Sequence, residues 1–99
     1  MAEVCLSLLG APALEEKLLD VLLMHPSIAT FVSQRAASHG GHPDALNASE
    51  QVQGRGDAVL VQALLEDTEA ETLLSDLRRG LSGSGLRYWL TPVLGEGEL

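Results

Sequence analysis

The stretch DAVLVQALLEDTEAETLLSDLRRGL, residues 57–81, decides the fold because it joins a strand pattern directly to a helix pattern. Residues 57–65 form a short apolar run that predicts a β-strand. Thr68 and Glu71 match a capping box, so we place the start of a helix at Thr68. Apolar residues then return at helical spacing and predict one buried helix face, formed by Ala70, Leu73, Leu74, Leu77 and Leu81.

Outward from this unit, the chain supplies one more helix and three more strands. Residues 4–9 and 86–90 are short, mostly apolar runs, and residues 28–38 are rich in β-branched and small side chains, so we predict a strand in each. Residues 13–24 have helical periodicity and predict a helix that ends before Pro26, because the residue before a proline resists helical geometry. The order strand–helix–strand–strand–helix–strand predicts an α+β ferredoxin-like βαββαβ sandwich, an antiparallel sheet with two helices on one face.

Length and charge exclude several classes of protein. The 99 residues predict a single domain over residues 1–94 and a flexible acidic tail over residues 95–99. The formal net charge of -8 and the aromatic content of 3% argue against binding to nucleic acid or directly to an anionic membrane. Cys5 is the only cysteine, so no disulfide can form within the chain. The N-terminal segment lacks the basic start of a signal peptide, and we therefore expect a cytoplasmic protein.

The predicted strands carry apolar side chains on both faces, although the helices can cover only one. In residues 4–9, Val4, Leu6 and Leu8 point to one side, whereas Cys5 and Leu9 point to the other. An exposed face would normally show polar residues in alternation. We therefore predict a homo-oligomer that packs its sheets together. The alternatives are a face with scattered apolar residues or a face covered by the tail.

The connection between the second and third predicted strands spans residues 39–56, far more than the two to five residues of an ordinary hairpin. Loops of this length in a compact domain are usually functional or disordered. Arg55 is the only basic residue between Arg35 and Arg78, which makes it a candidate contact for an anion. The alternative is an ordinary surface arginine at a solvated hairpin end.

The same connection suggests a metal site. His39 and His42 are separated by two residues on a glycine-rich segment, so both imidazoles could bind one ion such as Zn, Cu or Ni. The alternative is a pair of solvent-exposed histidines. Trp89 could stack on a ligand, but a tryptophan on a terminal strand more often packs in a core or a subunit interface. The sequence contains no arrangement of nucleophile, base or paired acids that suggests catalysis, so we predict that the protein is not an enzyme.

Three further stretches carry a resemblance to a known family: LEEKLLD (14–20), EQVQGR (50–55) and YWLTPV (88–93). In this order they resemble the PII-like superfamily of trimeric ferredoxin-like signalling proteins, and within it a small bacterial PII-like family. The resemblance implies a homotrimer with its sheets facing inward. It also makes residues 39–56 the counterpart of the T-loop, which engages a protein target, such as a membrane transporter.

The resemblance further implies a ligand site at the cleft between subunits, where the T-loop, a B-loop and a C-terminal segment meet. The glycine-rich turn at residues 80–85 would be the B-loop. Residues 81–85 and 94–99 contain no base to hold phosphates, which argues against ATP or ADP binding in the manner of the family and leaves the ligand unknown. The candidate ligand-binding residues are Gln53, Gly54, Arg55, Gly83, Gly85 and Arg87.

The sequence therefore predicts a PII-like regulatory or sensor protein that binds a small ligand at the subunit cleft and signals through residues 39–56. The alternative is a metal-binding protein of divalent-cation (heavy-metal) tolerance that uses His39 and His42. A nucleotide sensor that relies on Arg55 or Arg87 is a third hypothesis.

Overall fold

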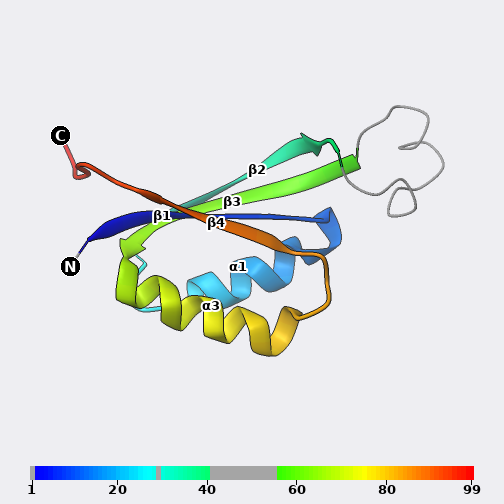
Figure 1. The fold of residues 1–99 in the computed structure, drawn as a ribbon, viewed down its shortest axis with the longest axis horizontal. Helices are drawn as coiled ribbons and strands as arrows, with labels where there is room; N and C mark the ends of the chain where they lie inside the picture. The colour runs from blue at the N-terminus through cyan, green and yellow to red at the C-terminus, as the bar shows by residue number, and fades with distance from the viewer. Residues whose placement is uncertain (1, 29, 41–55) are drawn as a thin grey trace.

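In residues 2–28, 30–40 and 56–99, which the computed structural model describes, the chain forms a four-stranded antiparallel sheet with its helices on one face (Figure 1). The strand order β2-β3-β1-β4 places β1 and β3 in the centre and β2 and β4 at the edges. The predicted ferredoxin-like arrangement is therefore confirmed. Along the chain the elements are β1 (Glu3–Gly10), the 3-10 helix η1 (Pro12–Leu14), α1 (Glu15–Leu23), β2 (Phe31–Ser38), β3 (Gly56–Glu66), α3 (Asp67–Leu81) and β4 (Arg87–Pro92).

All four strands are found, and their ends differ from the prediction by three residues or fewer. β2 begins at Phe31 rather than at residue 28, because the backbone N–H of Ile28 bonds the carbonyl oxygen of His25 and holds the preceding residues in a turn. Gly56, which we assigned to the connection, is the first residue of β3 and is the partner of Ser38 in the ladder. His39 and Gly40 follow β2, and residues 41–55 lie outside the described residues.

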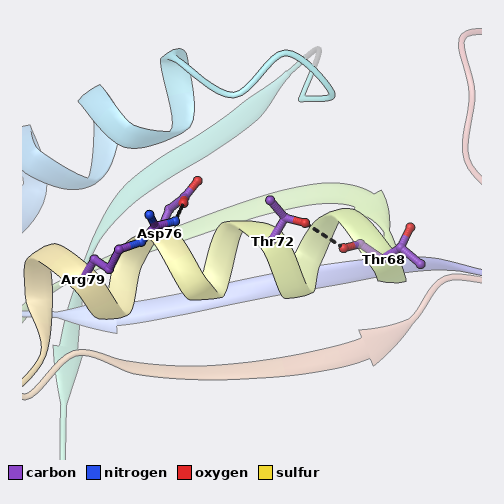
Figure 2. Close-up of polar contacts among 4 residues, drawn as sticks. All are labelled: Thr68, Thr72, Asp76 and Arg79. Carbon is purple, nitrogen blue, oxygen red and sulfur yellow. Dashed lines mark hydrogen bonds and ion pairs between the residues drawn. The ribbon is translucent and has the colours of Figure 1, made fainter.

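The start of α3 differs as well, and the predicted capping box is wrong. Strand β3 passes directly into the helix at Asp67, whose backbone N–H bonds the carbonyl oxygen of Ala2 at 2.9 Å. Thr68 already lies in the first turn, where its N–H bonds Oδ1 of Asp67 at 2.8 Å. Its carbonyl oxygen accepts the hydroxyl of Thr72, and Asp76 pairs with Arg79 one turn later on the exposed side of the helix (Figure 2).

The hydrophobic core lies between the helices and the facing side of the sheet. The predicted apolar face of α3 is confirmed, since every one of its five members is buried. The paired strands β1 and β3 supply the opposite wall with residues that share one face by register. The buried core residues are Leu6, Leu8, Leu18, Leu22, Val59, Val61, Ala63, Leu65, Ala70, Leu73, Leu74, Leu77 and Leu81.

The other side of the sheet, here called the open face, is not covered by the helices (Figure 1). Its exposed apolar side chains include Val32 (54% exposed), Leu64 (41%) and Trp89 (42%). Its centre is polar, because the amide Nε2 of Gln62 donates to Oγ of Ser7 at 3.1 Å. The tail leucines Leu94 and Leu99 are fully exposed, so the tail packs neither of them on this face. The open face therefore combines exposed apolar side chains with a central Gln62–Ser7 pair that is hydrogen-bonded within the chain.

His25, just after α1, is buried, with 8% of its surface exposed. Its Nδ1 lies 2.8 Å from Oγ of Ser27, and the hydroxyl of Ser27 bonds Oε2 of Glu69 at 3.2 Å. His25 therefore belongs to a hydrogen-bonded link between the end of α1 and the first turn of α3.

This link makes a stability prediction. Ser27→Ala removes the hydroxyl that joins His25 to Glu69, and we expect the free energy of unfolding to fall by about 1 kcal/mol. Ser75→Ala, at an exposed position of α3, is the matched control and should change stability by no more than about 0.5 kcal/mol. Urea denaturation followed by circular dichroism measures both. Equal stabilities of the two variants would show that the link does not stabilise the fold.

Candidate functional site

A groove opens on the helix side of the sheet, between the C-terminal half of α3 and strand β4, and encloses about 230 Å³. Its floor is apolar and includes Leu74, Leu77 and Leu81 of the helix. These side chains also belong to the core, so the floor is held in place by packing. We call this feature the α3–β4 groove.

The turn at one end of the α3–β4 groove is built by glycine and serine. Gly83 and Gly85 line the groove and have φ angles of 81° and 82°, in the left-handed region that favours glycine. Ser84 holds the turn against the end of α3, because its hydroxyl donates to the carbonyl oxygen of Leu81 at 2.6 Å. The sequence GSG therefore reverses the chain within a few residues and directs it into β4.

The rim of the groove carries Arg78 and Tyr88. The guanidinium carbon of Arg78 lies 5.8 Å from the centroid of the Tyr88 ring, and its Nη2 donates to the phenol oxygen at 3.4 Å. Among the described residues Arg78 forms no ion pair, whereas Arg79 pairs with Asp76 and Arg35 pairs with Glu15. A positive charge without a carboxylate partner therefore borders an apolar groove.

The structure separates the candidate ligand-binding residues that it describes. Gly83 and Gly85 line the α3–β4 groove, as described above. Arg87 is exposed and lies opposite Leu9 of β1, so it shares the open face rather than the helix side. Successive residues of a strand point to opposite faces, which is why Tyr88 reaches the groove and Arg87 does not. The other three candidates, Gln53, Gly54 and Arg55, lie outside the described residues.

Sequence reasoning missed Arg78 and Tyr88. Arg78 had a sufficient explanation in the last turn of a helix, where the helix dipole favours a cation. The sequence signal was the alternation along the last predicted strand, which places Arg87 and Tyr88 on opposite faces. In the structure, Tyr88 pairs with Leu8, whose side chain is in the core, so Tyr88 is the residue on the helix side. That pairing places the phenol ring beside the final turns of α3.

The metal hypothesis concerns His39 and His42. His39 is exposed just after β2, and His42 lies outside the described residues, so their pairing stays a prediction. Within residues 2–28, 30–40 and 56–99, no three side chains of His, Cys, Asp or Glu are grouped so that they could hold a metal ion. Cys5 instead joins the polar centre of the open face, with its sulfur 3.9 Å from Nε2 of Gln62.

Comparison with known proteins places the chain in a family. A family model described as "Protein of unknown function (DUF3240)" matches residues 1–99. The chain belongs to the DUF3240 family. A solved DUF3240 protein from Shewanella baltica OS155 is 16% identical, with a TM-score of 0.82, and the match covers 100% of this chain and 98% of that one. A search of curated proteins by sequence gives no match.

Other solved structures relate this DUF3240 chain to PII-like proteins. CPII, a nitrogen regulatory PII-like protein from Thiomonas intermedia K12 bound to ADP, AMP and bicarbonate, has a TM-score of 0.73 at 12% identity, with 99% of this chain and 98% of that chain covered. The B. subtilis GlnK–ATP complex has a TM-score of 0.68 at 12% identity, with coverages of 94% and 85%. At these identities the likeness shows the fold alone, and it confirms that the chain has the fold of PII-like proteins.

Among residues 2–28, 30–40 and 56–99, no helix is both long enough and apolar enough to cross a membrane.

Proposed function

We propose that this DUF3240 protein is a PII-like regulatory protein rather than an enzyme. It forms a homotrimer, binds a small ligand at the cleft between subunits and signals to a protein partner through residues 39–56. The observation that carries the proposal is the α3–β4 groove at the Gly83–Gly85 turn, in a fold whose solved members include CPII with ADP, AMP and bicarbonate and GlnK with ATP. In the trimer, this groove is the part of the ligand site that each chain supplies.

The open face supports the homotrimer. It leaves the apolar side chains of Val32, Leu64 and Trp89 largely exposed in a single chain. Several exposed apolar side chains on one sheet face favour an interaction site there, and a symmetric oligomer covers them with further copies of the same surface. The central Ser7–Gln62 hydrogen bond is already formed within one chain. Burial of this polar pair in an interface therefore costs less than burial of an amide and a hydroxyl that are not bonded to each other.

The partner in this proposal is another protein, such as a membrane transporter, as the PII-like resemblance implies. The ligand enters from the helix side, and its binding changes the order of residues 39–56, which the partner recognises. The alternative function in metal tolerance is supported only by the spacing of His39 and His42. The sensor function is supported by both the fold and the α3–β4 groove.

Hydrogen exchange measured by mass spectrometry tests ligand sensing. The protein is exposed separately to ADP, AMP, ATP, bicarbonate, hexanoate and octanoate. We expect at least one of these probes to slow amide exchange in peptides covering residues 39–56 and the turn at residues 82–85. Unchanged exchange with every probe at millimolar concentration would contradict the proposed function.

A matched pair of glycine variants shows whether the protection depends on the turn. Gly85→Ala forces an alanine into a left-handed backbone conformation, at a cost of about 1–2 kcal/mol, and should abolish the ligand-dependent slowing. Gly80→Ala, in α3 with nothing within 4 Å of the added methyl group, should keep it. Equal protection in the two variants would exclude the turn from the ligand site.

A further inference from the structure

We propose that the α3–β4 groove binds a small amphipathic carboxylate, with an aliphatic chain on the leucine floor and the carboxylate on Arg78. The inference rests on the proposed sensor function and names the ligand class of its site. Three properties of the groove lead to it: its size, its apolar floor and the single positive charge at its rim.

The size of the groove favours a small ligand. Within one chain it holds about 230 Å³ and is open to solvent on one side. A dry apolar cavity of about 150 Å³ holds one benzene molecule, whereas pockets for drug-sized ligands take about 300–1,000 Å³. The part of the site that one chain supplies therefore matches a body of about six to eight carbon atoms.

The floor selects an aliphatic chain. Leu74, Leu77 and Leu81 line the groove and are otherwise buried, with exposed fractions of 4%, 4% and 8%. No carboxylate side chain borders the groove among the described residues, so nothing there repels an anion through direct contact. Each methylene that leaves water for such a surface strengthens binding by about fourfold.

The rim selects a carboxylate head. Arg78 has no carboxylate partner in the described part of the chain, and a guanidinium binds a carboxylate through two parallel hydrogen bonds. Tyr88, whose phenol oxygen is 3.4 Å from Nη2 of Arg78, can donate its own hydrogen to the same group. A dianion such as a phosphate monoester fits less well, since one cation faces it beside the partly negative C-terminal end of α3, in a chain with a net charge of -8.

Titration by two-dimensional NMR tests this site on the full-length protein, with octanoate as the probe. The amide signals of Gly83 and Gly85 should move, while those of Gly95 and Gly97 in the tail should not. Hexanoate, shorter by two methylenes, should bind about tenfold more weakly. Octan-1-ol, which keeps the chain and lacks the charge, should also lose about tenfold or more, and octyl phosphate should bind more weakly than octanoate.

Two adjacent arginines provide matched variants, because both are exposed in α3 and only one borders the groove. Arg78→Gln should weaken octanoate binding by about tenfold or more. Arg79→Gln, which removes the ion pair with Asp76, should leave the affinity within about twofold. Equal losses in the two variants would indicate a general effect of charge and would overturn the proposal.

The outcomes separate this inference from the proposed function. If ADP or ATP moves the Gly83 and Gly85 signals and octanoate does not, the carboxylate site is wrong while the sensor function stands. If octanoate binds in the groove and none of the probes, octanoate included, changes exchange in residues 39–56, the carboxylate site is supported and the proposed function is contradicted. Tighter binding of octyl phosphate than of octanoate would overturn the choice of a monoanion.

Discussion

Replacement of Leu64 by lysine is expected to convert the protein from trimers to monomers. Leu64 lies on the open face, 41% exposed in a single chain and opposite Cys5 of the central strand β1. In the proposed trimer this position is covered by a neighbouring copy, so each subunit would bury a lysine charge without a partner. The penalty for such burial is several kcal/mol per ion, and the three-fold symmetry applies it to each subunit.

Light scattering coupled to size-exclusion chromatography measures the change as a fall in mass to one third. Leu23→Lys is the matched control, because Leu23 is a leucine 72% exposed at the end of α1, in the helix layer. That variant should remain a trimer, and both variants should keep the circular dichroism spectrum of the parent. A parent protein that is monomeric at micromolar concentration, or a trimeric Leu64→Lys variant, would refute the proposed assembly.

The second large effect concerns the core. Leu73 of α3 is completely buried, at 0% exposure, among the side chains that join the helices to the sheet. Leu73→Ala removes buried methyl groups and leaves a cavity that the surrounding packing fills only in part. We expect the free energy of unfolding to fall by about 2–5 kcal/mol, a large fraction of the roughly 5–15 kcal/mol that stabilises a typical domain.

Guanidinium denaturation followed by circular dichroism measures this loss. Leu23→Ala makes the same chemical change at an exposed position and should alter stability by no more than about 0.5 kcal/mol. Both variants are compared at one protein concentration, since association stabilises the folded chain by mass action. A Leu73→Ala variant as stable as Leu23→Ala would show that α3 does not depend on its packing at this position.

Much of the fold could be predicted from the sequence, because hydrophobic periodicity directly reflects burial. The apolar face of α3 is a clear case, since the residues spaced at helical intervals are the ones that the sheet covers. The start of the same helix could not be predicted in this way. Thr68 and Glu71 form a plausible local signal, but the carbonyl oxygen of Ala2, distant in sequence, binds the N–H of Asp67 and starts the helix one residue earlier.

The candidate site was predictable only in part. Gly83 and Gly85 stood out in the sequence, and both line the α3–β4 groove. Arg87 is the basic residue closer to them in sequence, whereas Arg78 is the one that lines the groove. Neighbouring residues of a strand point to opposite faces of the sheet. Which residues of β4 face the groove therefore depends on the register of β4 against β1, which a single sequence does not reveal.

The central position of β1 also has a consequence for the synthesis of the chain. This strand is made first, yet its ladder partners are far along the chain, with Glu3 opposite Glu66 and Val4 opposite Pro92. Contacts of such large sequence separation form late, because the intervening chain must be ordered before they are gained. During synthesis β1 therefore stays unpaired until β3 has emerged, and one of its edges stays open until β4 follows, which makes this interval the one in which the chain is exposed to aggregation.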